Sequence, residues 1–317
     1  RYKSINYTML TSFFNKSKPI NFLLVGFLMV FYFLFVNFFI VDKTISVSYT
    51  LKKVGLLLVY LFLMVLINFI VKRNRVTKRN TYTIFFFAVF SMMFLPILKS
   101  SNVLISGLFI LLSLRRVVSL RSGIHIKKKL FDASFWVGFA YLFYPESILF
   151  IILPFFGILL YANTDFKNWL IPFVALMAVY IIETCFSLLV YESFFLPLSS
   201  FSVPVLSFSN YHSAKIIVPI SVLLTFNIWA LFYFLKSLQN ATRRLKATLY
   251  LVLAAWLVSI LVIILSPHKN GSELLFFILP VCIMGANYFE QKGEYIFKEV
   301  LLVSLVLLTV LVPFIAF

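Results

Sequence analysis

Charged side chains are scarce in this chain. Only 12% of its 317 residues are charged and only ten are aspartate or glutamate, whereas 62% are hydrophobic. A soluble globular domain carries about twice this share of charge. A mean hydropathy of +1.04 is also too high for a chain that buries a single apolar core in water. The composition therefore excludes a soluble fold and indicates a protein of the membrane.

Cysteine and glycine are rare as well. The two cysteines, Cys185 and Cys282, both lie inside apolar runs, so we expect buried free thiols and no disulfide. No cysteine or histidine pattern has the spacing of a metal site, and no glycine-rich loop could hold a nucleotide phosphate. We therefore expect neither a metal nor a cofactor. Nine glycines in the whole chain also argue against tight small-residue packing as a general theme between the helices.

Long apolar runs recur along the whole chain. Such runs are long enough to cross the roughly 30 Å hydrocarbon core as helices, and in hydrocarbon a helix pairs its own backbone groups. The sequence predicts an all-α, polytopic membrane protein that forms one integral membrane domain over residues 1–317, with residues 1–18 as a cytoplasmic N-terminal segment and no soluble domain. About eleven segments are predicted: Pro19–Ile40, Val54–Val71, Tyr82–Leu98, Val103–Val118, Ala133–Tyr144, Ile148–Tyr161, Trp169–Tyr191, Ile216–Leu235, Thr248–Leu265, Leu274–Phe289 and Val300–Phe317.

The fifth and sixth segments form a special pair. Ala133–Tyr144 and Ile148–Tyr161 are too short to cross the bilayer at about 1.5 Å per residue. Pro145, between them, lacks an amide hydrogen and disfavours helical geometry at the preceding residue. We therefore expect a hairpin of two short helices with a hinge at Pro145.

Lysine and arginine are distributed unevenly among the predicted loops. If the N-terminus lies in the cytoplasm, 22 of the 28 lysine and arginine residues fall on the cytoplasmic side. Cytoplasmic loops of membrane proteins carry such an excess. The pattern predicts a multi-pass protein of the bacterial inner membrane with its N-terminus inside and, given eleven segments, its C-terminus outside.

Two basic clusters dominate that count, KRNRVTKR at residues 72–79 and RRVVSLRSGIHIKKK at residues 115–129. We interpret both as topology signals that also contact anionic headgroups; docking of an acidic partner is the alternative. Apolar residues in the second cluster suggest that part of it lies along the membrane interface as an amphipathic segment. Because the predicted topology accounts for nearly all of the basic residues behind the net charge of +18, we do not expect nucleic acid as a partner.

The few ionisable groups predicted outside, or within a segment, are the candidates for chemistry. Glu183 lies inside an apolar segment, where an ionisable side chain usually faces a cavity or a partner. A protonated Glu183 that fixes helix packing is the equal alternative. Glu146 lies at the expected hinge. Asp42 follows the first apolar segment, either as a solvated boundary residue or as a functional carboxylate.

His268, Lys269 and Glu273 lie close together directly before the apolar segment Leu274–Phe289. A carboxylate is favoured at the start of a helix, so we expect Glu273 to cap and orient that helix. The amide donors of a helix start, flanked by Lys269 and His268, could also bind a phosphate. Two interpretations stay open: a plain helix cap beside a loop lysine, or a lipid-phosphate site in an outward-opening cavity.

Two stretches resemble the GT-C membrane glycosyltransferase fold. Residues 130–160 (LFDASFWVGFAYLFYPESILFIILPFFGILL) resemble its short-helix pair. Residues 268–289 (HKNGSELLFFILPVCIMGANYF) resemble a late segment that neighbours the lipid-linked phosphate donor in that superfamily. The resemblance implies a catalytic acid in the first outward loop, where Asp42 fits, although this loop is short and no arginine lies on the outward face. The chain as a whole resembles an uncharacterised family of polytopic inner-membrane proteins from Bacteroidota.

Three functions follow as hypotheses. The first is a non-catalytic protein of cell-envelope assembly with a GT-C-like frame, whose partners are membrane lipids or other envelope membrane proteins. The second is a glycosyltransferase that uses a polyprenyl-phosphate-linked sugar at the periplasmic face, with Asp42 as the catalytic base or as the acidic residue that orients the acceptor. The third is a transporter. The sequence shows no inverted repeat, which argues against this third hypothesis. The expected ligand contacts are His268, Lys269, Glu273, Glu146 and Glu183.

Overall fold

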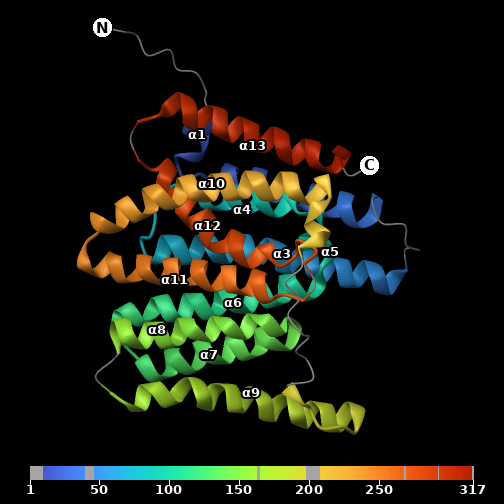
Figure 1. Ribbon diagram of the computed structural model, residues 1–317, viewed down its shortest axis with the longest axis vertical. Helices are drawn as coiled ribbons and strands as arrows, with labels where there is room; N and C mark the ends of the chain where they lie inside the picture. Colours follow the sequence, from blue (N-terminus) through green and yellow to red (C-terminus); the bar gives the residue numbers. More distant parts are fainter. Residues whose placement is uncertain are drawn as a thin grey trace.

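The computed structural model describes residues 10–39, 46–162, 165–197, 208–267, 269–291 and 293–315. These residues form helices and connections without any β-strand, as predicted. Most of the helices lie side by side with their axes roughly parallel (Figure 1). Their bounds are α1 Leu10–Phe14, α2 Pro19–Leu34 with the π-helix η1 Phe35–Phe39, α3 Val47–Arg73, α4 Tyr82–Met93, α5 Leu95–Lys99, α6 Ser101–Ser119, η2 Leu120–Ser122, α7 Ile126–Phe143, η3 Pro145–Ile151, α8 Ile152–Tyr161, α9 Lys167–Tyr191, η5 Ser209–His212, α10 Ala214–Gln239, α11 Arg243–Leu265, α12 Leu274–Phe289 and α13 Tyr295–Ile315.

Each predicted segment corresponds to a helical run in this structure. Seven of these helices are long and apolar enough to cross a membrane, and shorter apolar helices lie among them. The segment Leu274–Phe289 coincides with α12. The predicted segment Tyr82–Leu98 is wrong as a single helix, because the chain leaves helical geometry at Phe94 and restarts as the short helix α5.

The hinge at Pro145 is confirmed. α7 ends at Phe143, Tyr144 is extended with φ −145° and ψ 99°, and a 3₁₀ helix begins at Pro145. The predicted start of the first hairpin helix at Ala133 is wrong, because α7 begins at Ile126 and is 18 residues long. Its first turn carries lysines, which end an apolar run in the sequence but do not end a helix, since their long side chains can reach polar surroundings.

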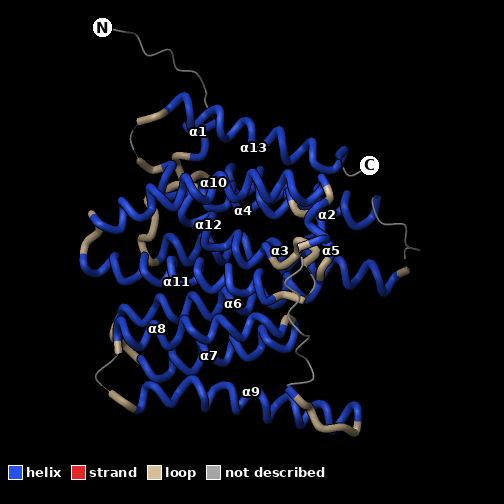
Figure 2. Tube along the Cα trace, viewed as in Figure 1, coloured by secondary structure: helices blue, strands red, loops and turns tan. Residues whose placement is uncertain are grey.

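The connections between helices gather at two ends of the bundle (Figures 1 and 2). The end at the left of both figures includes residues 74–81, 120–125, 240–242 and 290–291, and we call it the basic end because the two basic clusters lie there. The other end includes residues 94–100, the Pro145 hinge and residues 266–267 and 269–273. This arrangement agrees with the predicted alternation of loops; that the basic end faces the cytoplasm remains a prediction from the positive-inside rule.

The helices α4 and α12 form the centre of the bundle. Every residue of α4 and nearly every residue of α12 is buried, as expected for helices that are apolar on all sides. Cys282, on α12, is a buried free thiol as predicted. The prediction for Cys185 is wrong in part, because this free thiol is exposed on α9. α9 packs along one side of the bundle (Figure 1), and its remaining apolar surface is exposed.

The close contact between Gly285 on α12 and Phe226 on α10 leads to a prediction about stability. A Cβ atom added at Gly285 would lie 2.6 Å from the ring of Phe226, which is itself held between Phe86 and Phe90. We expect Gly285→Ala to destabilise the protein by about 1–3 kcal/mol, as overpacked cores do. Gly55→Ala, where the added atom meets nothing within 4 Å, should stabilise α3 by about 0.5–1 kcal/mol. Thermal unfolding in one detergent compares the two; equal shifts would contradict the packing argument.

Candidate functional site

Three segments from distant parts of the chain enclose a polar cleft at the end of the bundle opposite the basic end. The cleft has a volume of about 240 Å³ and lies between the start of α6, the Pro145 hinge and the α11–α12 connection. We call it the end cleft. Its polar side chains come from Ser100, Asn102, Tyr144, Glu146, Ser266, Asn270 and Ser272.

Breaks in the helices position these side chains. The extended backbone at Tyr144 turns the chain into η3, so that Glu146 lies in its first turn, only 7% exposed. The Tyr144 hydroxyl and the Ser266 hydroxyl form a hydrogen bond of 2.7 Å, which ties the hinge to the end of α11. Across the cleft α6 begins at Ser101, and the first amide groups of a helix have no acceptor within it. The end cleft therefore combines hydroxyl, amide and carboxylate groups in one small space.

Glu273 is fully buried beside the end cleft and does not line it. One carboxylate oxygen accepts hydrogen bonds from the Tyr211 hydroxyl and, at 3.1 Å, from the Gly271 amide. The other oxygen is buried without a hydrogen-bond partner among the described residues. Burial raises the pKa of Glu273 above its ordinary value. The carboxylate makes no capping hydrogen bond to α12, so it orders the connection before the helix and does not cap the helix itself.

Lys269 is also buried, with 1% of its surface exposed. Its ammonium group donates hydrogen bonds of 3.0 Å to the carbonyl oxygens of Ile264 and Ser266, and it lies 4.7 Å from the centroid of the Phe208 ring. The last carbonyl groups of a helix have no partner within it, so Lys269 closes the C-terminus of α11. It does not line the end cleft. These contacts support a structural role for Lys269, which is to stabilise the end of α11, over the role of a phosphate ligand.

The other residues predicted as ligand contacts are placed as follows. Glu146 lines the end cleft. Glu183 lies partly exposed on α9, which contributes no residue to the cleft. Asp42 and His268 lie outside the described residues, so their predicted roles stay predictions. Among the residues that the structure describes, no group of three or more His, Cys, Asp or Glu side chains could hold a metal ion.

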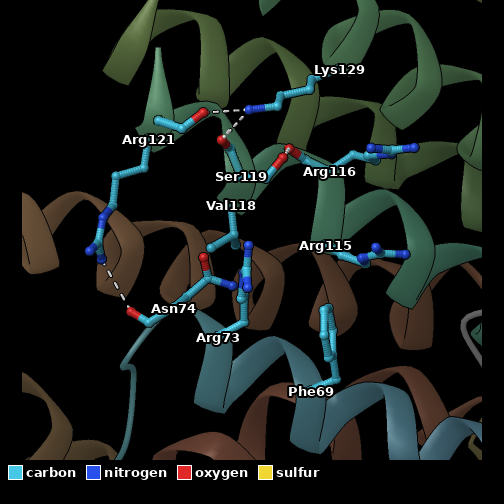
Figure 3. Close-up of a pocket in the computed structure, with 10 residues that line it drawn as sticks. Phe69, Arg73, Asn74, Arg115, Arg116, Val118, Ser119, Arg121 and Lys129 are labelled. Atoms are coloured by element: carbon cyan, nitrogen blue, oxygen red, sulfur yellow. Dashed lines mark hydrogen bonds between the residues drawn. The ribbon is translucent and has the colours of Figure 1, made fainter. Parts of the chain in front are cut away.

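A larger cavity lies at the basic end, between the C-terminal turns of α3 and α6 and the start of α7. Its volume is about 720 Å³, and we call it the basic pocket (Figure 3). The two basic clusters meet there, because the Arg121 guanidinium donates a hydrogen bond of 3.1 Å to the Asn74 carbonyl oxygen. Its lining includes Phe69, Arg73, Arg115, Arg116, Arg121 and Lys129.

Sequence reasoning missed the basic pocket because it considered each cluster separately. Apolar residues of the second cluster also have another role than expected: Val117, Val118 and Leu120 are buried in the core, while Ile124 is exposed. The predicted amphipathic segment at the interface is therefore wrong for those three residues. One signal in the sequence could have indicated the cavity. Residues 117–120 present an apolar face to the core, and the arginine and lysine residues that follow lie on another face, where they can line a cavity.

The fold and its apolar helices define a multi-pass α-helical membrane protein. Residues 9–317 match a family of unknown function, DUF6427, and because the match spans nearly the whole chain, the protein belongs to this family. No curated protein and no solved structure matches the chain.

Proposed function

We propose that this protein is a non-catalytic component of cell-envelope assembly in the bacterial inner membrane, and that its end cleft binds the hydroxyl-rich headgroup of a membrane lipid. The observation that carries the proposal is the end cleft itself, where Glu146 and the polar side chains opposite it lie in about 240 Å³. Sugar hydroxyl groups both donate and accept hydrogen bonds, and a mixed lining of carboxylate, amide and hydroxyl groups suits them. This volume is below the roughly 300–1,000 Å³ of drug-sized sites, so we expect one small headgroup.

The charges around the end cleft favour binding of a sugar lipid without transfer of its sugar. None of the lining residues that the structure describes is a lysine or an arginine, and the ammonium group of Lys269, beside the cleft, donates hydrogen bonds to backbone carbonyl groups. Release of a polyprenyl phosphate from its sugar would place negative charge on the leaving oxygen, and an enzyme stabilises such charge with positioned cations or donors. The described lining offers hydroxyl and amide donors but no lysine or arginine for this purpose, which favours binding of the sugar lipid over transfer of its sugar.

A GT-C-type glycosyltransferase that uses a polyprenyl-phosphate-linked sugar is the second candidate. The observation that favours it is the Pro145 hinge, which places the buried carboxyl group of Glu146 in the cleft. In this alternative Asp42 or Glu146 would act as the general base on the acceptor hydroxyl.

The binding proposal is tested with the full chain in nanodiscs that contain a polyprenyl-phosphate-linked hexose. We expect Glu146→Gln to weaken its binding about tenfold, because a hydrogen bond to a charged acceptor contributes about 1.5–3 kcal/mol. Glu192→Gln, an exposed carboxylate after α9, is the matched control and should bind like the wild type. Native mass spectrometry measures the retained lipid.

Three results decide between the candidates. Loss of binding in Glu146→Gln with no consumption of the sugar lipid by the wild type supports the non-catalytic proposal. Release of polyprenyl phosphate by the wild type, abolished in the Glu146 or Asp42 amide variant, supports the enzyme instead. Equal retention by the wild type and both glutamine variants would reject a role for the end cleft in binding.

A further inference from the structure

We propose that the basic pocket binds the phosphate group of an anionic membrane lipid. The pocket lies at the opposite end of the bundle from the end cleft, so this inference goes beyond the proposed function and does not depend on it. Its volume of about 720 Å³ is that of an ordinary small-ligand site, roughly 300–1,000 Å³. The ligand is inferred from the charge of the pocket, from the side chains without partners, and from the surface that leads to it.

The lining of the basic pocket carries positive charge only. Among the residues that the structure describes, its ionisable lining consists of arginine and lysine from both basic clusters and includes no carboxylate. Asp132 lies 3.1 Å from Arg116 and offsets one of these charges. Like charges that line one cavity repel one another, and an anion bound in the cavity would reduce that repulsion.

Three of the five cationic side chains have structural partners. Arg116 pairs with Asp132, Arg121 donates to the Asn74 carbonyl oxygen, and Lys129 donates to the Ser119 carbonyl oxygen at 2.8 Å. Cations at these positions stabilise the C-terminal ends of α3 and α6, where carbonyl groups lack partners. Figure 3 shows the Arg121 and Lys129 contacts on one side of the pocket. These residues are explained by the fold alone.

Arg73 and Arg115 are not explained in this way. Neither guanidinium group has a hydrogen-bond or ion-pair partner among the described residues. Arg115 lies over the ring of Phe69, with its guanidinium carbon 5.0 Å from the ring centroid (Figure 3). A guanidinium group stacked on an aromatic ring still presents its N–H donors at its edge, and its fork geometry matches a phosphate.

The surface of α3 that leads to the pocket indicates a lipid as the source of the phosphate. Leu58, Phe62, Val65 and Phe69 are all exposed. Their spacing of three and four residues places them on one face of the helix, and Phe69 also lines the pocket. An acyl chain along this face would place its headgroup next to Arg73 and Arg115. Basic pockets between membrane helices bind anionic headgroups in this manner. A soluble phosphate compound would make no use of the apolar face.

A plain topology signal is the competing explanation of the basic residues. The positive-inside rule accounts for the number of lysine and arginine residues at this end. It does not account for the convergence of two clusters on one cavity, or for two guanidinium groups in that cavity that have no acceptor among the described residues. The two explanations make different predictions for lipid binding. A phosphate site requires the arginine residues that line the pocket, whereas a topology signal depends only on the total positive charge at this end.

The experiment compares two double variants of the full chain that each remove two positive charges from the basic end. Arg73→Gln/Arg115→Gln changes the pocket, whereas Arg79→Gln/Lys128→Gln changes exposed residues outside it. Binding of phosphatidylglycerol, with phosphatidylcholine as the zwitterionic reference, is measured by native mass spectrometry after delipidation. We expect the pocket variant to bind phosphatidylglycerol at least about tenfold more weakly than the wild type, and the control variant to bind like the wild type. Circular dichroism and thermal unfolding establish that both variants are folded.

The arms of the experiment separate the possible sources of phosphate. Equal binding of phosphatidylglycerol by the two variants would overturn the inference, because only total charge would then matter. Pyrophosphate is added as the soluble probe. If it binds the wild type and not the pocket variant, while phosphatidylglycerol binds both equally, the lipid assignment is overturned. Selective loss of phosphatidylglycerol in the pocket variant, without competition from millimolar pyrophosphate, supports it.

Discussion

Replacing Lys269 with methionine should lower the free energy of unfolding by about 2–4 kcal/mol. The ammonium group donates to the carbonyl oxygens of Ile264 and Ser266, and each buried acceptor left without a donor costs about 1–3 kcal/mol. Methionine keeps the length and the apolar stem of lysine, so the loss reports on the hydrogen bonds and not on a cavity. Thermal unfolding of the purified protein in one detergent measures the change.

The control for this prediction is Lys52→Met. Lys52 is exposed at the start of α3, on the same end of the bundle, and an exposed lysine away from such contacts contributes within about 0.5 kcal/mol. The same preparations also test the phosphate interpretation of Lys269. If Lys269→Met unfolds at the temperature of the wild type but retains less polyprenyl-phosphate lipid, the lysine is a ligand contact and its structural role is rejected.

Much of the fold could be predicted from the sequence because hydrocarbon leaves few alternatives to a helix. The break at Pro145 followed from the chemistry of proline, and α12 could be bounded because polar residues stand at both of its ends. The start of α7 could not be predicted, because Lys127 to Lys129 interrupt the apolar run in the sequence but do not interrupt the helix. Nor could the sequence distinguish the buried Cys282 from the exposed Cys185: lipid-facing and core-facing side chains are equally apolar, so the pattern carries little information about which is which.

The candidate sites were predicted less completely, for a different reason. Scarcity of charge singled out Glu146, Lys269 and Glu273, and all three lie in or beside the end cleft. Their individual roles depend on hydrogen bonds to backbone groups, such as those of Lys269 to the end of α11, and no sequence pattern specifies these. The basic pocket depends on the meeting of residues 72–79 with residues 115–129. That pairing is a tertiary contact, which neither cluster indicates alone.

Replacing Glu273 with glutamine should make the protein more stable at neutral pH and less sensitive to pH. Burial raises the pKa of Glu273 above the ordinary value of 4.5, so the folded protein holds this proton more tightly than the unfolded chain. The stability linked to the proton is then fully present below the ordinary carboxyl pKa and is lost as the pH rises through the raised value.

Glutamine keeps an oxygen that can accept from the Tyr211 hydroxyl and the Gly271 amide, and it removes the charge that the buried site disfavours. We expect a gain of about 1–3 kcal/mol at the upper end of the range from pH 5 to 8, because the neutral amide avoids most of the cost of burying an ionised carboxylate, and a smaller gain at pH 5. Glu192→Gln, an exposed carboxylate at the same end of the bundle, should shift the unfolding temperature little at any pH in this range. The measurement is the unfolding temperature of the three proteins across that range. A constant difference between wild type and Glu273→Gln, or a less stable glutamine variant at pH 8, would contradict this prediction, because Glu273 would then be ionised in the folded protein and its charge would be stabilised there.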